Sequence, residues 1–172
     1  MDAKLRIAAK RLLNVCRERG LRVATAESCT GGLVAGALTE IPGSSDVVER
    51  GFVVYSNAAK ESMLGVPAAT LRRYGAVSQQ TAVAMAAGAL ENSDADLTVS
   101  ITGVAGPGGG SKLKPVGLVH FAAAARDGRT LHRRRLFGKI GRGRVRERSV
   151  MQALELLDML AQHSGSSRGH PH

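Results

Sequence analysis

The chain has 172 residues, a length that favours a single domain with enough apolar surface to bury a core. With 3% aromatic residues and no tryptophan, that core must be aliphatic and rich in alanine. The net charge of +10 leaves a nucleic-acid partner open, whereas two cysteines argue against a disulfide framework and no apolar run approaches the roughly 20 residues of a membrane span. We therefore expect a cytoplasmic protein without a membrane segment.

The first half of the chain alternates helical and extended patterns, which favours parallel strand pairing. Helices are predicted where apolar residues recur every three to four positions, and strands where short apolar runs lie between polar residues. In chain order the predicted elements are a helix from Leu5 to Cys16 that stops at Gly20, a strand over 21–25, a helix over 30–40, a strand over 51–56, a helix capped by Ser56 or Asn57 and reaching Met63, a short helix from Pro67 to Tyr74, and a helix capped by Ser78 and reaching Leu90.

The second half predicts more strands, a glycine-rich loop and a final helix. These elements are a strand over 96–103, a loop over 105–115, strands over 116–125 and 130–137, and a helix over 144–162. The Asp127-Gly128 pair lies between two extended segments and is a hairpin signal. The polar residues 164–172 are expected to be disordered. We predict one α/β domain over residues 1–163, with a mixed, mostly parallel sheet and helices on both faces.

A serine lies at the junction between the first strand and the helix that follows it. In open α/β sheets, ligands bind beyond the carboxyl ends of the strands, which is where Ser28 is expected. Backbone N–H groups from Cys29 to Gly32 could bind an anion or an oxyanion there, and Gly31 allows close approach of a substrate. The plainer alternative is that Ser28 or Thr30 only caps the helix, and Cys29 is either a small buried residue or itself the nucleophile.

A reactive serine needs a base, and "YSNAAK" offers one. Tyr55 ends the second predicted strand and Lys60 lies on the first turns of the next helix, so both could face Ser28. Lys60 would act as a base only if burial lowered its pKa from about 10.4, and a solvated helix lysine is the commoner case. The histidines His120 and His132 fall on predicted strands instead.

Two further segments have both a functional and a plain interpretation. The glycines of "GVAGPGGGS", 103–111, permit a backbone whose N–H groups converge on phosphate, but they also suit a long connection. The segment 133–148 has eight Lys or Arg residues, which suits nucleic acid, a phosphorylated ligand or a solvated face. Stacking aromatics are almost absent, so a nucleic-acid partner is not expected. Metal-ligand spacing is absent, and we expect no metal and no cofactor.

Several long motifs occur together in one order: "TAESCTGG", "IPGSSDVVERGFVVYSNAAKESMLGV", "YGAVS", "ITGVAGPGGGSKLKPVG" and a closing helix with "VR". Over roughly residues 5–160 the chain resembles the CinA C-terminal domain family, in its stand-alone form. That family includes nicotinamide-nucleotide amidases. The resemblance implies an amidohydrolase that converts nicotinamide mononucleotide to nicotinate mononucleotide and ammonia in pyridine-nucleotide recycling. It also implies that the protein is a homo-oligomer and that its partner is a small-molecule nucleotide, the substrate. We expect neither a nucleic-acid partner nor a membrane.

The resemblance also implies roles for individual residues. The family's serine nucleophile matches Ser28, its lysine matches Lys60, and its tyrosine, expected to hydrogen-bond to one or both, matches Tyr55. Oxyanion and substrate contacts are expected from Cys29, Thr30, Gly31, Thr102, Gly106, Gly109, Gly110, Ser111 and Arg142.

One position departs from the family pattern. Gly141 stands where the family commonly has an aspartate before the final helix, so Arg142 loses a carboxylate partner. The glycine loop or Arg142 would bind the substrate phosphate. Three alternatives remain open: a non-catalytic nucleotide-binding module linked to DNA processing, a basic nucleic-acid-binding domain, and an amidase for another carboxamide.

Overall fold

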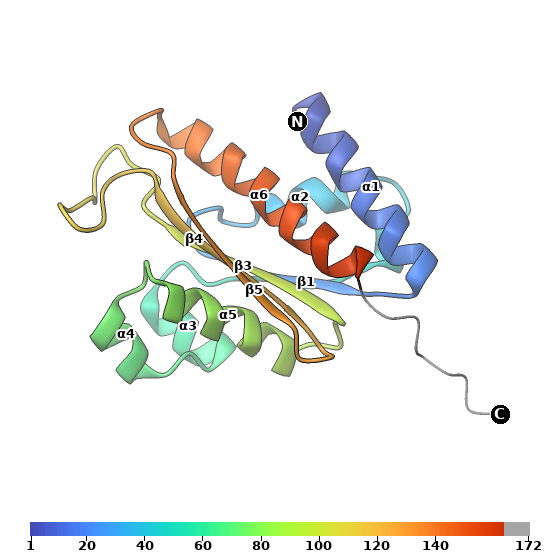
Figure 1. Cartoon of the computed structure of the whole chain (residues 1–172), viewed down its shortest axis with the longest axis horizontal. Coiled ribbons are helices and arrows are strands. Elements are labelled where there is room, and N and C mark those ends of the chain that lie inside the picture. The colour runs from blue at the N-terminus through green and yellow to red at the C-terminus, as the bar shows by residue number, and fades with distance from the viewer. Residues whose placement is uncertain (164–172) are drawn as a thin grey trace.

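A computed structural model describes residues 1–163 of the chain, and the expected disorder of 164–172 lies outside the described residues. Helices and strands alternate through the first part, and a hairpin and a long helix complete the fold (Figure 1). The elements are α1 (Ala3–Arg19), β1 (Val23–Glu27), α2 (Leu33–Thr39), the 3-10 turn η1 (Ser44–Asp46), β2 (Val48–Val53), α3 (Asn57–Leu64), α4 (Ala68–Tyr74), α5 (Gln79–Glu91), β3 (Leu97–Gly103), β4 (Leu118–Ala125), β5 (Thr130–Leu136) and α6 (Arg142–Gln162).

The five strands form one mixed sheet in the order β2-β1-β3-β4-β5. β1 lies between β2 and β3 and is parallel to both, while β4 is antiparallel to both of its neighbours. Only β4 therefore runs against the other strands, which confirms the predicted mixed sheet. The carboxyl ends of β1, β2 and β3 meet at one edge, and Ser28 follows β1 at that edge.

Helices cover both faces of the sheet, as predicted (Figure 1). The helices α1, α2 and α6 pack on one face over a large aliphatic core that includes Leu12, Val99 and Leu157. On the other face, α3 and α5 cover smaller clusters around Met85 and Ala122. Among the described residues, no helix is long and apolar enough to cross a membrane.

The predicted helix caps explain where several elements begin and end. Ser56 rather than Asn57 caps α3, because its hydroxyl accepts a hydrogen bond from the N–H of Ala59 at 3.0 Å. Ser78 caps α5 in the same way. At the predicted hairpin, the Asp127 carboxylate accepts from the N–H of Arg129 at 3.1 Å, which fixes the turn between β4 and β5.

The start of α2 differs from the prediction. The helix begins at Leu33 rather than at Thr30, because Gly31 and Gly32 have φ values of +59° and +101°. This left-handed backbone interrupts an α-helix and suits glycine. The segment from Cys29 to Gly32 is therefore a turn, and its N–H groups do not form the first turn of a helix.

Two histidines on the hairpin give a prediction for stability against pH. Nδ1 of His120 and Nε2 of His132 are 3.0 Å apart, and burial, followed by the charges of His132, Arg134 and Lys114, lowers the pKa of His120 to about 4. Unfolded His120 titrates near 6.5, so the unfolded chain binds more protons between pH 6.5 and 4. The free energy of unfolding should therefore fall by roughly 2–3 kcal/mol as the pH drops through that window.

Urea denaturation of wild type and His120→Gln at pH 7.5 and pH 4.5 measures this effect. The variant lacks the titrating ring and should lose clearly less stability than wild type over the same interval. Equal losses in the two proteins would show that His120 is not responsible.

Candidate active site

Ser28 and Lys60 come from different elements and meet at the carboxyl edge of the sheet. The N–H of Ser28 donates to the carbonyl of Ile101 at 2.9 Å, which continues the pairing of β1 with β3 by one residue. Lys60 lies on α3, and its Nζ donates to Ser28 Oγ at 3.1 Å. The structure thus places the two predicted side chains in direct contact.

Lys60 is one of the largest fully buried side chains of the domain, at 1% exposure. The capped start of α3 places it one turn before Leu64, on the face that packs toward the sheet. Its amine also donates to the carbonyls of Val54 at 3.1 Å and Tyr55 at 3.4 Å, and no carboxylate within residues 1–163 forms an ion pair with it. Burial lowers the pKa of Lys60, and the neighbouring Cys29 opposes this shift. A lysine of this kind can lose its proton and accept one from a hydroxyl.

Cys29 is a poor candidate for the nucleophile. Its side chain is buried, and burial raises the pKa of the Cys29 thiol to about 11. The thiolate is the reactive form of cysteine, so a thiol with this pKa stays protonated and inert near neutral pH. The geometry therefore favours Ser28 as the reactive group of the pair.

The turn after Ser28 uses one of its four expected backbone donors internally. The N–H of Gly31 donates to the carbonyl of Ser28 at 3.0 Å, and just beyond the turn the N–H of Leu33 donates to the carbonyl of Thr30. The N–H groups of Cys29, Thr30 and Gly32 donate to no backbone carbonyl within residues 1–163. Of the donors expected from Cys29 to Gly32, these three are thus free, and those of Cys29 and Thr30 are the nearest in sequence to Ser28. The Thr30 hydroxyl is buried without a hydrogen-bond partner among the described residues.

Sequence reasoning missed Glu27, the last residue of β1. Its carboxylate is fully buried and accepts from the N–H groups of Val34 at 2.8 Å and Ala35 at 3.1 Å. A carboxylate at the N-terminus of a helix binds orphan donors and suits the helix dipole. Glu27 therefore holds α2 against the strand that carries Ser28. The signal available in the sequence was a single acidic residue at the end of a buried strand.

Arg146 on α6 was also missed as an individual residue, although it belongs to the quoted "VR" motif. Its Nε donates to the carbonyl of Cys29 at 3.1 Å, and its second terminal nitrogen donates to the carbonyl of Thr30 at 3.3 Å. The guanidinium thus holds two successive peptide carbonyls of the turn that follows Ser28.

Tyr55 is not placed as expected. Its side chain is 62% exposed, and its hydroxyl accepts a hydrogen bond from Arg142 at 3.0 Å rather than bonding to Ser28 or Lys60. Only the backbone carbonyl of Tyr55 contacts the Lys60 amine. The side chain turns outward because Arg142, at the start of α6, supplies a partner there. Arg142 also donates to the carbonyl of Gly106 at 2.9 Å.

Arg142 therefore bridges Tyr55, which follows β2, and Gly106 in the loop that follows β3. Because β1 lies between these two strands, the bridge spans the same edge at which Ser28 lies. A phenol and a carbonyl take the place of the carboxylate partner that the family pattern supplies. Gly141 has a φ of +98° and caps α6 without any side-chain hydrogen bond.

The remaining predicted residues make no side-chain hydrogen bond to Ser28 or Lys60 within residues 1–163. The hydroxyl of Thr102, at the end of β3, donates to the carbonyl of Ala76 at 2.7 Å. Ser111 is bound within the loop itself, where it exchanges hydrogen bonds with Lys114. No hydrogen bond joins Gly109, Gly110 or Ser111 to Ser28, Lys60, Tyr55 or Arg142. A side chain at Gly106 or Gly110 would collide with Val116, which explains the small residues there.

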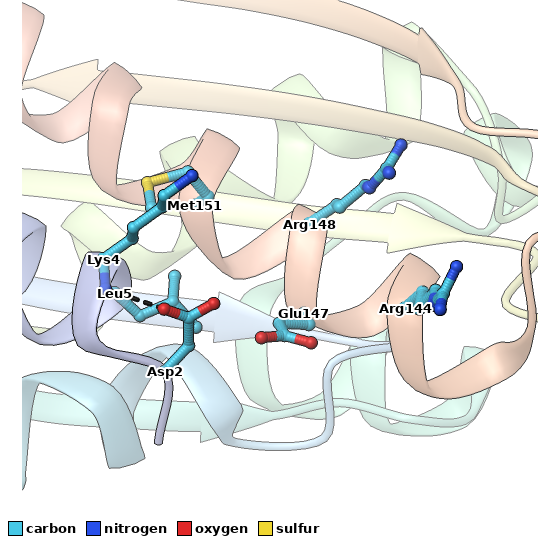
Figure 2. A pocket seen from close by; sticks show the side chains of 7 residues that line it. All are labelled: Asp2, Lys4, Leu5, Arg144, Glu147, Arg148 and Met151. Atoms are coloured by element: carbon cyan, nitrogen blue, oxygen red, sulfur yellow. Dashed lines mark hydrogen bonds between the residues drawn. The ribbon is translucent and has the colours of Figure 1, made fainter.

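A separate pocket of about 420 Å³ lies between the beginnings of α1 and α6 (Figure 2). None of the predicted site residues lines it. Its lining consists of Asp2, Lys4, Leu5, Arg144, Glu147, Arg148 and Met151. Within the described part of the chain, no three His, Cys, Asp or Glu side chains gather closely enough to hold a metal ion.

Comparison with known proteins places this arrangement in a family. The CinA C-terminal domain model matches residues 6–161. "Nicotinamide-nucleotide amidohydrolase PncC" of Escherichia coli K12 is 48% identical over 156 residues, covering 91% of this chain and 94% of its own length. A "Putative competence-damage inducible protein" of Caldicellulosiruptor bescii is 49% identical, and the match covers 85% of this chain but only 35% of that longer protein.

The fold agrees with this assignment. The crystal structure of competence/damage inducible protein CihA from Agrobacterium tumefaciens superimposes with a TM-score of 0.92 at 55% identity, covering 93% of this chain and 97% of that one. The overall fold is thus shared with this solved relative. The chain belongs to the CinA C-terminal domain family.

Proposed function

We propose that this protein is a nicotinamide-nucleotide amidase that hydrolyses nicotinamide mononucleotide to nicotinate mononucleotide and ammonia. The observation that carries the proposal is the 3.1 Å contact between Ser28 Oγ and the buried Nζ of Lys60. The name and the full-length match of the Escherichia coli relative support the choice of substrate. The reaction needs one nucleophile and one base, which this contact supplies.

In the first step, neutral Lys60 accepts the Ser28 proton while Oγ attacks the carboxamide carbon. The free N–H groups of Cys29 and Thr30 stabilise the negative charge that develops on the carbonyl oxygen. Lys60 then gives the proton to the leaving nitrogen, and ammonia departs from an acyl-enzyme ester. Water, deprotonated by Lys60, attacks the ester, and Ser28 takes the proton back as nicotinate mononucleotide leaves.

The bridge formed by Tyr55, Arg142 and Gly106 is the proposed site for the substrate phosphate. Its guanidinium lies at the edge that carries Ser28 and is hydrogen-bonded to neutral groups only, so its charge remains available to an anion. Gly109, Gly110 and Ser111 belong to the same loop and are proposed to line the nucleotide rather than to bind the reacting carboxamide. Thr102 is proposed to support the floor of the site through Ala76.

The basic segment 133–148 gives less support to a nucleic-acid-binding function. Its charges are divided between β5 and α6. Arg133 and Arg135 donate to Gln152, and Arg146 is engaged by the turn after Ser28. A continuous phosphate-binding surface would leave such side chains free. On the basis of the family resemblance, we propose that residues 1–163 form the amidohydrolase domain and that the protein is a cytoplasmic homo-oligomer.

An ammonia-release assay tests the function and the phosphate site together. Wild type should release ammonia from nicotinamide mononucleotide at a far higher kcat/KM than from nicotinamide riboside, which lacks the phosphate. Arg142→Ala should raise KM for the mononucleotide about tenfold to a hundredfold, because a charge-assisted contact contributes about 1.5–3 kcal/mol. The variant should leave the rate with the riboside nearly unchanged.

The matched control is Arg144→Ala, which removes an equal charge from the first turn of the same helix. Arg144 lines the pocket that also includes Asp2, Lys4 and Leu5 (Figure 2), and no hydrogen bond joins it to Ser28, Lys60 or Tyr55 within residues 1–163. It should keep the wild-type KM. No ammonia from the mononucleotide with wild type would refute the proposed function, and equal KM values for the two variants would remove Arg142 from the phosphate site.

A further inference from the structure

Arg146 holds the turn after Ser28 from the side opposite Lys60. The helix α6, which carries Arg146, covers one face of the sheet, whereas α3, which carries Lys60, covers the other (Figure 1). The guanidinium binds the carbonyls of Cys29 and Thr30 at 3.1 and 3.3 Å. Both carbonyls therefore point toward α6, while the Ser28 hydroxyl points toward α3.

The contact of Arg146 with the two carbonyls also fixes the direction of the backbone N–H groups in the same peptide units. In a trans peptide the C=O and the following N–H point in opposite directions. Since the carbonyl of Cys29 faces Arg146, the N–H of Thr30 in the same peptide unit points away from Arg146, toward the side of the Ser28 hydroxyl. The N–H of Gly31 is turned in the same sense and is already bound to the carbonyl of Ser28.

We propose that Arg146 is a positioning residue that aims the N–H of Thr30 at the oxyanion formed during amide hydrolysis. This inference rests on the proposed amidase function and adds the group that orients its oxyanion donor. In this proposal Arg146 acts through the backbone of the turn, because its hydrogen bonds go to the Cys29 and Thr30 carbonyls and not to Ser28 Oγ. Its positive charge beside the Cys29 carbonyl also polarises that peptide unit, which makes the Thr30 N–H a stronger donor.

Two features of the turn fit this role. Gly31 has a φ of +59°, a backbone conformation that suits glycine, and a Cβ built on it would be in ordinary van der Waals contact with the Arg146 guanidinium. Glu27 fixes the other end of the turn through α2. With both ends held, a donor aimed correctly in the free protein needs no reorganisation when charge develops.

The kinetic test compares Arg146→Ala, Arg146→Lys and Arg148→Ala on nicotinamide mononucleotide. Arg146→Ala should lower kcat by about 100-fold with KM within about threefold, because an oxyanion donor acts in the transition state and its loss costs about 10²–10³ in kcat. Arg146→Lys keeps the charge but cannot bind two carbonyls as a planar fork, so it should recover part of kcat. Arg148→Ala, on the α1 side of the helix, should match wild type (Figure 2).

Inhibitor binding separates positioning from a general structural role. The 3-formylpyridine analogue of the mononucleotide can form a tetrahedral adduct with Ser28, in which Oγ bonds to the aldehyde carbon and the aldehyde oxygen becomes the oxyanion. Its affinity should fall in Arg146→Ala by the same factor as kcat. The affinity for the product, nicotinate mononucleotide, should change by less than about threefold.

Backbone NMR gives a readout that does not depend on activity. Arg146→Ala should shift the amide resonances of Thr30 and Gly31, whose peptide units lose the guanidinium, and Arg148→Ala should not. Unchanged Thr30 and Gly31 resonances in Arg146→Ala overturn the proposed role of Arg146, whether or not the wild-type protein is active. A wild-type protein that is inactive on the mononucleotide refutes the amidase function, which is a separate outcome. An unchanged kcat in Arg146→Ala also overturns the proposed role of Arg146. If Arg146→Ala does not fold, the test uses Arg146→Lys, and wild-type kcat and inhibitor affinity in that variant overturn the proposal.

Discussion

Lys60→Met should abolish ammonia release and at the same time stabilise the fold. A positioned general base contributes about 10²–10⁴ to the rate, and the serine also loses its hydrogen-bond partner, so we expect a loss of at least about 10³-fold in kcat. Methionine matches the length of the side chain and suits an apolar surrounding that includes Leu64.

Stability should rise because the native fold holds an amine at 1% exposure, and no carboxylate of the described residues forms an ion pair with this amine. Desolvation of such a group costs more than its hydrogen bonds to Val54 and Tyr55 return, since each bond contributes only about 0.5–1.5 kcal/mol. We expect the free energy of unfolding at pH 7 to increase by about 1–2 kcal/mol in the variant. Functional sites commonly trade stability for reactivity in this way.

The pH dependence gives a sharper test of the same point. Burial lowers the pKa of Lys60 in the folded state, whereas the unfolded chain keeps a value near 10.4. Between these two values the unfolded state binds more protons, so the stability of wild type rises with pH relative to Lys60→Met. The advantage of the variant should therefore shrink as urea titrations move from pH 7 to pH 10.

The comparison with the variant cancels the titrating groups that do not interact with Lys60, because both proteins contain them. In wild type, kcat/KM should rise with pH as Lys60 loses its proton. Two results would contradict a lowered pKa of Lys60: a free energy of unfolding that is lower in Lys60→Met than in wild type at pH 7, or a stability difference in favour of the variant that grows with pH.

The contact between Ser28 and Lys60 could be predicted because it depends on topology. Parallel strands end at one edge, and a serine after β1 and a lysine early in the helix after β2 must then lie near one another. The family resemblance selected these two residues from several candidates. The alternation of helices and strands and the Asp127-Gly128 turn likewise come from local signals that tertiary packing does not override.

Other features could not be predicted because they depend on long-range contacts. The partners of Arg146 lie more than 100 positions earlier in the chain, and nothing local indicates that its guanidinium will meet two carbonyls. Tyr55 turns outward for a similar reason, since Arg142 approaches from the last helix. The late start of α2 is different: the Gly31-Gly32 pair is a local breaker signal, and its left-handed backbone overrides the helical pattern of the residues around it.

Ser28→Ala should cause the largest loss of activity, about 10⁴-fold or more in kcat, because among the described residues Ser28 is the one nucleophile hydrogen-bonded to Lys60. Cys29→Ala is the matched control at the neighbouring position. It removes a thiol whose pKa is about 11 but keeps the backbone N–H, so it should retain kcat within about threefold. Circular dichroism and urea titration should show both variants folded.

Acid-quenched mass spectrometry identifies the residue that forms the intermediate. During turnover of nicotinamide mononucleotide, the peptide containing Ser28 should gain the mass of the acyl group in wild type and in Cys29→Ala, and should gain none in Ser28→Ala. The ester forms only if the Ser28 proton has gone to Lys60 and ammonia has left, so its presence reports on both steps. An adduct that forms in Ser28→Ala and is absent in Cys29→Ala would identify the Cys29 thiol as the nucleophile. Lys60 would then not act by accepting the Ser28 proton.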